Sequence, residues 1–349
     1  MKKNIPVAFG NITTVKKIKI FYLKESCPGI NRKKIGKYFN YYNAEGEIIK
    51  DTDVLIRIKS LIIPPAWKNV WISPYNNSHL QATGYDARGR KQYRYHCDWN
   101  TKRSETKFSR LITFARTLPG LMAEIENNLK QKELTKEKVT ALVVKIMSVS
   151  FIRIGNHGYE KENGSYGLTT LKDKHVNIHG DSIKFAFKGK KGVWQDIELH
   201  DKRLARMVKS CRDIPGHELF QYYDDEGQRH VIDSGDVNSF LHQICGTDFS
   251  AKDFRTWAGS LHAFKALTRL PIPETETEFK HKTLEVIKDV SKLLGNTPAV
   301  CRKYYVHPII LESYGKGELF EFYKTHNAVA IESGKDFEED MLIEFLERN

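Results

Sequence analysis

The sequence predicts an α+β protein in which a small β-rich N-terminal domain precedes a larger, mainly α domain that holds one small three-stranded sheet. Three patterns lead to this class: two hairpin signals in the first hundred residues, helical periodicity beyond them, and short alternating segments between residues 167 and 200. A chain of 349 residues is long enough for two domains that each bury a core, and 40% hydrophobic residues lie in the globular range.

The N-terminal domain is predicted from its two hairpins and from the polar stretch that follows them. Written as strand, turn and strand, the hairpins are 40–42, 43–46 and 48–49, then 80–85, 86–89 and 92–96. Residues 100–105, NTKRSE, are polar and are expected to form a linker. We therefore expect one domain over residues 1–100 and a second over residues 101–349.

In the second domain, apolar periodicity predicts helices on both sides of the small sheet. Two helical faces are marked by Phe108, Leu111, Ile112 and Ala115, and by Val139, Leu142, Val143 and Ile146. Turns at residues 180–181 and 189–192 separate the strands of the sheet. Three later helix signals complete the pattern: a capping box at Ser250 and Asp253, a periodic segment from Leu284 to Leu294, and a helix start at Thr297 and Pro298.

Positive charge is concentrated in the N-terminal domain. The chain has 56 Lys+Arg and 43 Asp+Glu, a net charge of +13, and residues 1–100 alone hold 18 bases and 7 acids. A basic face of this kind either keeps a protein soluble or attracts a polyanion such as a nucleic-acid backbone. Residues 332–349 have the opposite sign, with 7 acids and 2 bases, and Phe337, Met341 and Phe345 recur there at helical spacing. We expect an acidic amphipathic helix that docks on the rest of the protein.

Membrane and secreted classes are not expected. No run of 18 apolar residues is present, and the basic residues at the start of the chain are not followed by an apolar segment. The five cysteines are widely spaced and odd in number, which favours unpaired thiols in a reducing compartment. These features together favour an intracellular soluble protein.

Nucleotide and metal cofactors are not expected either. The sequence has no G-x-x-x-x-G-K-[ST] phosphate loop, no H-E-x-x-H and no C-x-x-C, and its 13 histidines are scattered. The densest internal acidic run, residues 224–226, stands beside Gly227 and is interpreted as an exposed turn. If the protein is an enzyme, fixed side chains must stabilise the charge that its reaction develops.

Three short segments contain arginines or tyrosines in settings that suggest a chemical role. Residues 150–156, SFIRIGN, place Arg153 in an otherwise apolar helix end, where an arginine needs an anionic partner. Residues 251–257, AKDFRTW, flank Arg255 with aromatic side chains, and residues 294–308, LGNTPAVCRKYYVHP, end a short basic helix in two tyrosines before a proline. Taken singly, each segment has an ordinary interpretation, such as a structural salt bridge or a tyrosine packed at a helix end.

Together these segments resemble the type IB DNA topoisomerases of the compact poxvirus and bacterial kind. The resemblance extends from residues 63–67, IPPAW, to residues 307–308, and includes residues 79–84 (HLQATG) and 89–95 (GRKQYRY). It implies the catalytic fold that these enzymes share with tyrosine recombinases, in two lobes that close around double-stranded DNA. The implied activity is relaxation of supercoiled DNA by transient single-strand cleavage through a 3′-phosphotyrosyl intermediate, followed by religation. The family further implies an ATP- and metal-independent monomer, DNA-associated in a bacterial-type cytoplasm or nucleoid, or of viral origin.

The family pattern assigns roles to residues of the C-terminal domain. Tyr305 matches the nucleophile; Tyr304 is the alternative, and the spacing of nine from Asn296 favours Tyr305. Arg153 and Arg255 match the two arginines that bind the scissile phosphate. Poxvirus members carry a histidine at the position of Asn296, and bacterial members often carry asparagine. This difference leaves a hydrogen bond to a phosphate oxygen as the implied role of Asn296, without proton transfer.

The remaining assignments are the general acid and the contacts to the DNA backbone. Lys190, on the turn between two predicted strands, matches the general acid, with Lys188 and Lys191 as close alternatives. Residues that match backbone-binding positions of the family are Tyr93, Tyr95 and Tyr159.

Two other functions stay open from the sequence. A tyrosine site-specific recombinase shares the catalytic residues, but such enzymes usually carry a helical core-binding domain where this chain has a β-rich one. A non-catalytic DNA-binding or nucleoid protein could keep the two lobes, but every expected catalytic residue type except the histidine is present here.

Overall fold

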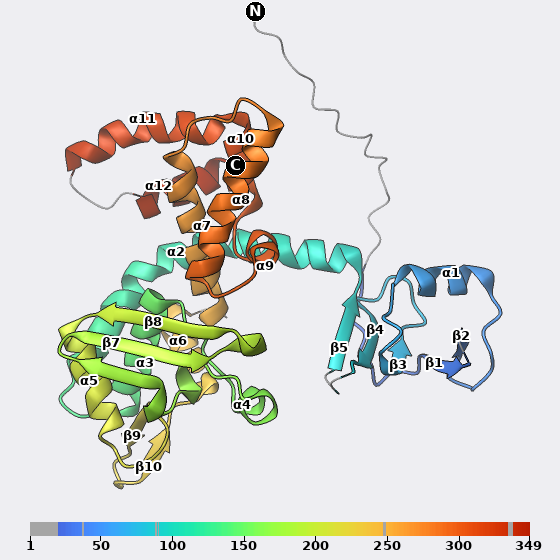
Figure 1. The fold of residues 1–349 in the computed structure, drawn as a ribbon, viewed down its shortest axis with the longest axis horizontal. Helices are drawn as coiled ribbons and strands as arrows, with labels where there is room; N and C mark the ends of the chain where they lie inside the picture. Colours follow the sequence, from blue (N-terminus) through green and yellow to red (C-terminus); the bar gives the residue numbers. More distant parts are fainter. Residues whose placement is uncertain (1–19, 37, 88, 90, 247–248, 334–337) are drawn as a thin grey trace, which may run out of the picture. The chain divides into compact units, whose positions relative to one another are not determined.

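The computed structural model describes residues 20–36, 38–87, 89, 91–246, 249–333 and 338–349, with the backbone alone for residues 100–107, 159 and 327–333. The chain divides into two compact units between Lys107 and Phe108. The N-terminal unit is β-rich, and the larger C-terminal unit is mainly helical with small sheets, so the predicted α+β class is confirmed (Figure 1). Over the described residues, no helix combines the length and the apolar character needed to cross a membrane.

The N-terminal unit is built on a five-stranded antiparallel sheet with the strand order β2-β1-β3-β4-β5. Its strands are β1 (Ile30–Ile35), β2 (Tyr38–Tyr42), β3 (Lys68–Ile72), β4 (Leu80–Tyr85) and β5 (Lys91–Tyr95). The hairpin predicted at 80–96 is confirmed as β4–β5. In the first predicted hairpin, Tyr42 and Ile48 form an isolated antiparallel bridge, while β2 pairs along its length with β1.

A short helix in this unit was not predicted. Helix α1 (Thr52–Ser60) begins at Asp51, whose carboxylate accepts hydrogen bonds from the backbone N–H groups of Asp53 and Val54. It buries Ile58 against the sheet, in a small core with Ile30, Val70, Ile72 and Ala82. With nine residues, this helix is shorter than the segments in which periodicity reliably identifies a helix.

The expected linker at residues 100–105 is wrong, because these residues lie within helix α2 (Cys97–Leu129). The stretch contains no glycine or proline, and the first proline of the helix is Pro119. Lysine, arginine and glutamate are good helix formers even when they are exposed, so a polar composition alone did not identify a break.

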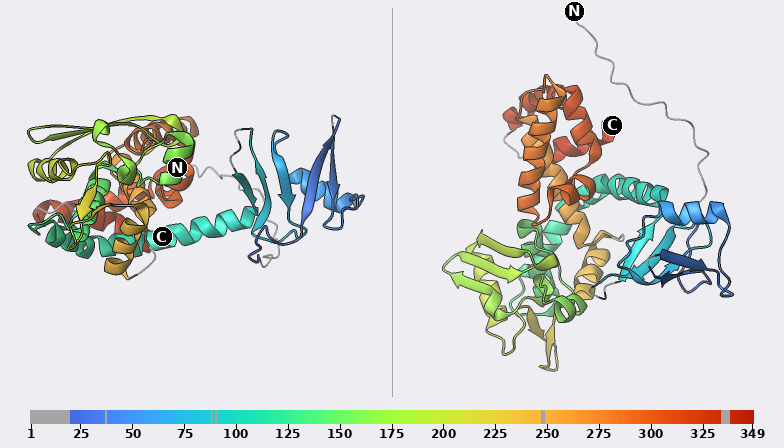
Figure 2. Two further views of the ribbon diagram at one scale, coloured as in Figure 1. Left: turned by 90° about the horizontal axis from the view of Figure 1, so that it is seen from below. Right: turned by 45° about the vertical axis from the view of Figure 1, so that its right-hand side comes forward.

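The C-terminal unit packs its helices around α3 and α7, which contact each other and most neighbouring elements. Beyond α2 its helices are α3 (Lys136–Ser150), α4 (His157–Asn163), α5 (Lys202–Arg212), α6 (Ser234–Cys245), α7 (Ala251–Thr268), α8 (Glu276–Leu293), α9 (Pro298–Tyr304), α10 (Pro308–Lys316), α11 (Glu318–Ser333) and α12 (Glu338–Arg348). Within this unit, helices α8–α12 gather in one bundle and the three-stranded sheet lies at the other end (Figures 1 and 2). The predicted helical faces are confirmed, since Phe108, Leu111, Val139 and Leu142 are buried.

The predicted sheet is confirmed as antiparallel strands β6 (Val176–His179), β7 (Ser182–Lys188) and β8 (Trp194–His200), with β7 in the centre. Short 3₁₀ helices precede it at Leu168–Thr170 (η1) and Asp173–His175 (η2), and a third, Lys190–Gly192 (η3), forms the β7–β8 turn. A second hairpin, β9 (Gln221–Tyr223) with β10 (Arg229–Val231), was not predicted, because strands of three residues are too short to show alternation. The acidic residues 224–226 form its turn, as expected.

The acidic tail docks on the C-terminal unit as predicted. Helix α12 buries Met341 and Phe345, while Phe337 lies outside the described residues. The carboxylate of Glu338 pairs at 2.6 Å with both Lys265 and Arg269, which lie at the C-terminal end of α7. These ion pairs hold helix α12 against the C-terminal end of α7.

Candidate active site

Arg153 lies just beyond the C-terminal end of α3, after a residue in the left-handed conformation. The helix ends at Phe151, whose φ of 54° redirects the chain. From there the guanidinium of Arg153 donates to the backbone oxygen of Gly295 at 3.3 Å and to the side-chain oxygen Oδ1 of Asn296 at 2.5 Å. The segment after α3 is thereby tied to the loop between α8 and α9.

A close contact between two glycines holds the backbone of this segment in place. Gly155 has a φ of 100°, and a Cβ atom on Gly167 would lie 2.5 Å from the backbone nitrogen of Gly155 and the backbone oxygen of Arg153. The same oxygen accepts the N–H of Leu168, the first residue of η1, at 2.9 Å. Glycine is required at both positions, at 155 for its positive φ and at 167 for the close approach.

Arg255 lies in the first turns of α7 and is only 4% exposed. The start of that helix is fixed by Asp253, whose carboxylate accepts the backbone N–H of Ser250 at 2.8 Å, as the predicted capping box requires. The Arg255 guanidinium donates to the backbone oxygen of Phe151 and, at 2.5 Å, to that of Leu294. Arg153, which lies in the loop after α3, and Arg255 both donate to the loop before α9, and Arg255 also donates to the loop after α3.

Neither arginine is paired with a carboxylate among the described residues; their hydrogen-bond partners are backbone oxygens, the amide oxygen of Asn296 and the side chain of Tyr305. Two further N–H groups at this site, Nε of Arg255 and Nδ2 of Asn296, are buried without a hydrogen-bond partner in the part of the chain that is described. A buried donor without a partner costs free energy, so such groups are kept where a ligand satisfies them. Two guanidinium groups and one amide thus place their donors at the same site, a typical arrangement for binding an oxyanion.

The positive charges at this site perturb one another. Burial, and next the charge of Arg255, lowers the pKa of Arg153 to about 10, and burial also lowers the pKa of Arg255. Desolvation of the Lys190 ammonium, followed by the charge of Arg153, lowers the pKa of Lys190 below that of an ordinary lysine. The site is therefore electropositive and prepared for an anion.

Tyr305 follows α9 directly and faces this cluster. The centre of its ring lies 5.3 Å from the guanidinium carbon of Arg255, which also hydrogen-bonds the Tyr305 side chain. Tyr305 is partly buried, whereas Tyr304 is 44% exposed and has the ammonium of Lys303 over its ring. Of the two adjacent tyrosines, the structure brings Tyr305 to the arginines.

Lys190 stands on the β7–β8 turn, close enough to Arg153 and Tyr305 for their charges to affect it. Lys188 ends β7, and its backbone oxygen accepts the N–H of Tyr166 at 2.9 Å. Lys191 has a left-handed φ of 62° at the tip of the turn. All three residues are exposed, and the site lowers the pKa of Lys190.

The structure describes the side chains of two of the three tyrosines that were assigned to DNA contacts. Tyr93 and Tyr95 alternate along β5 with their rings stacked, centroids 6.1 Å apart, and both line a surface pocket of about 410 Å³ together with Lys24 and Lys91. The pocket combines aromatic faces with the ammonium of Lys24 and with the ion pair of Lys91 and Glu25. The side chain of Tyr159 lies outside the described residues.

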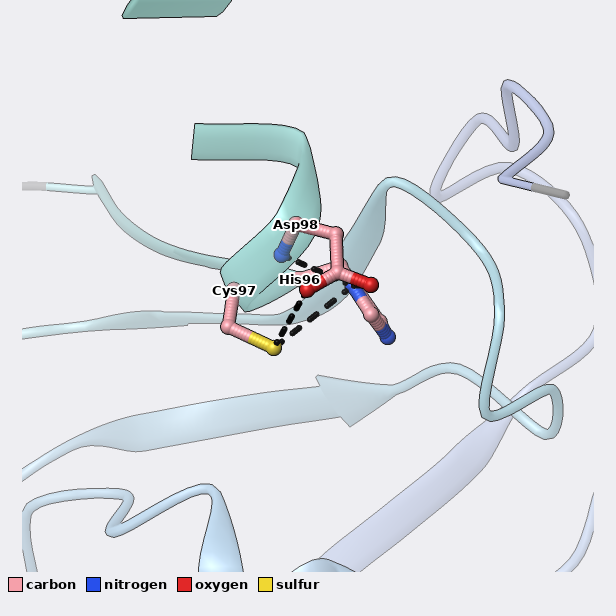
Figure 3. Close-up of side chains that lie close together, drawn as sticks. All are labelled: His96, Cys97 and Asp98. Atoms are coloured by element: carbon pink, nitrogen blue, oxygen red, sulfur yellow. Dashed lines mark hydrogen bonds and ion pairs between the residues drawn. The ribbon is translucent and has the colours of Figure 1, made fainter. Parts of the chain in front are cut away.

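One group of potential metal ligands occurs at the start of α2, at His96, Cys97 and Asp98 (Figure 3). The Nδ1 atom of His96 accepts the backbone N–H of Asp98 at 3.1 Å, so its lone pair is already used. The Cys97 sulfur lies 3.4 Å from Asp98 Oδ1 and 3.8 Å from His96 Nδ1. This arrangement begins a helix, and we assign no metal to it.

Comparison with known proteins agrees with this geometry. Residues 96–326 match the family described as "Eukaryotic DNA topoisomerase I, catalytic core", and residues 38–86 match "Bacterial DNA topoisomerase IB, N-terminal domain". The chain belongs to the type IB DNA topoisomerase family. One relative is "DNA topoisomerase 1B" of Acanthamoeba polyphaga mimivirus, 32% identical over 310 residues that cover 87% of this chain and 92% of the relative. Another is "DNA topoisomerase 1B" of Vaccinia virus (strain Copenhagen), 27% identical over 293 residues that cover 80% and 88%.

Sequence reasoning missed one residue, Gln195, which holds two loops of the candidate site together. Gln195 on β8 packs between two glycines: a Cβ on Gly295 would lie 2.4 Å from its Oε1, and one on Gly189 would lie 3.1 Å from its Cγ. It thereby joins the Lys190 turn to the Asn296 loop. A glutamine in a strand of alternating burial gives no sequence signal for such a role.

Proposed function

We propose that this type IB topoisomerase relaxes supercoiled duplex DNA by cutting and resealing one strand at the site formed by Tyr305, Arg153, Arg255, Lys190 and Asn296. The observation that carries this proposal is the cluster of buried guanidinium and amide donors that have no carboxylate partner among the described residues and that adjoin Tyr305. A phosphodiester has one negative charge and two non-bridging oxygens, which match these donors.

In the cleavage step, water takes the phenolic proton of Tyr305, the phenolate oxygen attacks phosphorus and the bond from phosphorus to the 5′-oxygen breaks. The products are a 3′-phosphotyrosyl ester and a 5′-hydroxyl. Arg255, which hydrogen-bonds the Tyr305 side chain, stabilises the negative charge that develops on the phenolic oxygen. In the reverse step the 5′-hydroxyl attacks the same phosphorus and releases the Tyr305 phenolate, which takes a proton from water.

Arg153 and Arg255 bind the non-bridging oxygens, on which charge increases in the transition state. Guanidinium groups remain charged at working pH and donate paired hydrogen bonds to an oxyanion. Asn296 adds a neutral donor, because its oxygen is already bound to Arg153 and its Nδ2 has no partner among the residues that the structure describes. Donors held in place in this way stabilise a transition state without the cost of reorganising at the moment of reaction.

Lys190 donates a proton to the leaving 5′-oxygen. Its lowered pKa makes the ammonium a better acid than an ordinary lysine, and its position on a turn lets it reach a leaving group. During religation the same amine takes the proton back from the 5′-hydroxyl. One ester replaces another in each direction, so no nucleotide hydrolysis is needed to conserve the bond energy.

The N-terminal unit supplies DNA contacts outside the reacting phosphate. Its basic residues and the aromatic pocket at Tyr93 and Tyr95 suit a sequence-independent grip on the backbone, and we assign the same role to Tyr159 of the C-terminal unit. Residues 1–100 thus form the DNA-clamp domain and residues 101–349 the catalytic domain of our proposal. We further propose that the enzyme acts as a monomer, without a nucleotide cofactor.

The test is relaxation of a negatively supercoiled plasmid in EDTA and without ATP, with wild type, Tyr305→Phe and Tyr304→Phe. We expect wild type and Tyr304→Phe to relax the plasmid and Tyr305→Phe to bind DNA without relaxing it. Relaxation by Tyr305→Phe with loss in Tyr304→Phe would move the nucleophile to Tyr304. No relaxation by wild type would refute the proposed activity.

A further inference from the structure

The geometry points to Gly259 and Ser260 of α7 as the positioning residues of the Tyr305 nucleophile. We infer that α7 acts as a common support that fixes the backbone of Tyr305 relative to Arg255. This inference rests on the proposed function, because it concerns how the proposed nucleophile is held.

The Ser260 hydroxyl connects the backbone on both sides of Val306. It donates to the backbone oxygen of Tyr305 at 3.2 Å and accepts the backbone N–H of His307 at 3.0 Å. Ser260 is fully buried, so water does not compete for either hydrogen bond. One side chain thus satisfies two backbone groups that adjoin the nucleophile and that no helix satisfies, since α9 ends at Tyr304 and α10 begins at Pro308.

Gly259 permits the close approach that makes these bonds possible. A Cβ atom at this position would lie 2.5 Å from the backbone oxygen of Tyr305 and 3.0 Å from its Cβ. Gly259 sits in the middle of α7, where glycine costs helix stability and where no left-handed conformation requires it. The contact with Tyr305 is therefore the structural reason for glycine at this position.

Arg255 precedes Gly259 by four residues, so the two lie on the same face of α7 about 6 Å apart along the helix axis. The phosphate-binding arginine and the surface that supports Tyr305 thus belong to one rigid element. The far side of the same segment is fixed by α9, because the backbone oxygen of Cys301 accepts the N–H groups of Tyr305 at 2.9 Å and Val306 at 3.1 Å. Displacing a reacting group by about 1 Å can cost about 10²-fold in rate.

Two variants with matched controls test this inference in single-turnover cleavage and religation of an oligonucleotide duplex. Ser260→Ala removes the hydroxyl, and its control Ser313→Ala removes a fully buried hydroxyl that has no hydrogen-bond partner in the described part of the chain. Gly259→Ala adds a methyl group against Tyr305, and its control Gly120→Ala adds one in helix α2 with nothing within 4 Å.

We expect Ser260→Ala and Gly259→Ala to lower the cleavage and religation rate constants together, by about 10²-fold, with noncovalent DNA affinity unchanged. Both steps need the same in-line geometry, so the cleavage equilibrium should not shift. A substrate with a sulfur atom as the 5′ leaving group should not rescue either variant, because protonation of the leaving group is not their defect. The control variants should cleave as wild type does.

The inference is overturned if both Ser260→Ala and Gly259→Ala cleave within about threefold of wild type while wild type traps DNA on Tyr305. It is equally overturned if a sulfur leaving group restores them, or if the control variants lose as much rate. A wild type that forms no covalent complex would instead refute the proposed function, so the two failures can be told apart.

Discussion

Arg153 donates a 2.5 Å hydrogen bond to the side-chain oxygen of Asn296, a residue 143 positions further along the chain. The bond fixes the orientation of the amide, because Oδ1 is held by the guanidinium and Nδ2 must point elsewhere. Nδ2 is buried and has no partner among the described residues. The pair therefore presents a charged and a neutral donor from two loops as one unit.

Substitution of Asn296 tests this orientation. In Asn296→Ala the donor is lost, and we expect cleavage to slow by about 10-fold, the loss expected for one hydrogen bond to a charged group. In Asn296→Asp the pair with Arg153 is kept but the second oxygen repels the phosphate, so cleavage should fall further than in the alanine variant. Single-turnover cleavage rates compare the two, and an aspartate variant more active than alanine would contradict the assigned donor.

Replacing either arginine by alanine should strongly lower the rate of DNA cleavage. We expect Arg153→Ala and Arg255→Ala to lower the cleavage rate about 10²–10³-fold, as for a fixed donor to a developing oxyanion. Arg255→Ala should also lower the melting temperature, because the backbone oxygens of Phe151 and Leu294 lose a buried donor. Arg269→Ala, at an exposed ion pair with Glu338, is the control and should change neither by much. Wild-type cleavage in either site variant would remove that arginine from the site.

Lys190 should control the alkaline side of the cleavage pH profile. A proton donor works while it is protonated, so the rate should fall as pH rises through the pKa of Lys190, which lies below that of an ordinary lysine. Lys190→Ala should cleave about 10²–10⁴-fold more slowly, and a 5′-sulfur leaving group should restore the rate and abolish the alkaline fall. Lys188→Ala is the control. If Lys188→Ala shows the defect and the rescue instead, the general acid is Lys188.

His307 should make the fold sensitive to acid. Its Nδ1 accepts the N–H of Ile309 at the start of α10, its ring packs edge-on against Phe108, and burial lowers its pKa to about 4. Between pH 6.5 and about 4 the unfolded chain binds a proton that the folded chain does not, so the free energy of unfolding falls as pH falls. Over this whole pH range, the loss in the free energy of unfolding amounts to about 3 kcal/mol. Urea unfolding at pH 7 and pH 5 should show a smaller loss in His307→Asn, which keeps a helix-capping oxygen; an equal loss would contradict this assignment.

DNA binding should depend strongly on salt. Contacts between the basic N-terminal unit and phosphates release counterions, so the logarithm of the binding constant should fall linearly with the logarithm of the salt concentration, with a slope of about −0.9 per phosphate contacted. Fluorescence anisotropy of a labelled duplex with Tyr305→Phe measures binding without cleavage. A binding constant that does not change with salt concentration would argue against contacts between this unit and the DNA phosphates.

Elements marked by local signals could be predicted from the sequence. The capping box of Ser250 and Asp253 began α7, Pro298 began α9, and glycine turns bounded the strands of the three-stranded sheet. Helix α1 and the β9–β10 hairpin were missed because they are short: the helix has nine residues, with Asp51 as its only cap signal, and each strand has three. The polar residues near the start of α2 were predicted to form a linker, because a polar composition indicates exposure and says little about helix propensity.

For the site, residue types were predictable from motifs, and their contacts were not. Arg153, Arg255 and Tyr305 stand in recognisable local strings, but the bonds that place them join residues far apart in the chain, such as Ser260 and Tyr305, separated by 45 positions. The packing of Gln195 against Gly295 likewise exists only after β8 and the α8–α9 loop have come together. No local pattern encodes these contacts.

The thiols of the chain differ enough in chemistry to serve as a labelling system. None of the five cysteines forms a disulfide; Cys97, at the start of α2, is exposed, while Cys211 and Cys301 are buried and burial raises their pKa to about 12 and about 11. Thiolates, not thiols, react with maleimides, so a fluorophore added near neutral pH should attach first to Cys97. With a second dye on DNA, energy transfer from that position would follow the helix that links the two units while a single molecule binds, cuts and releases its substrate.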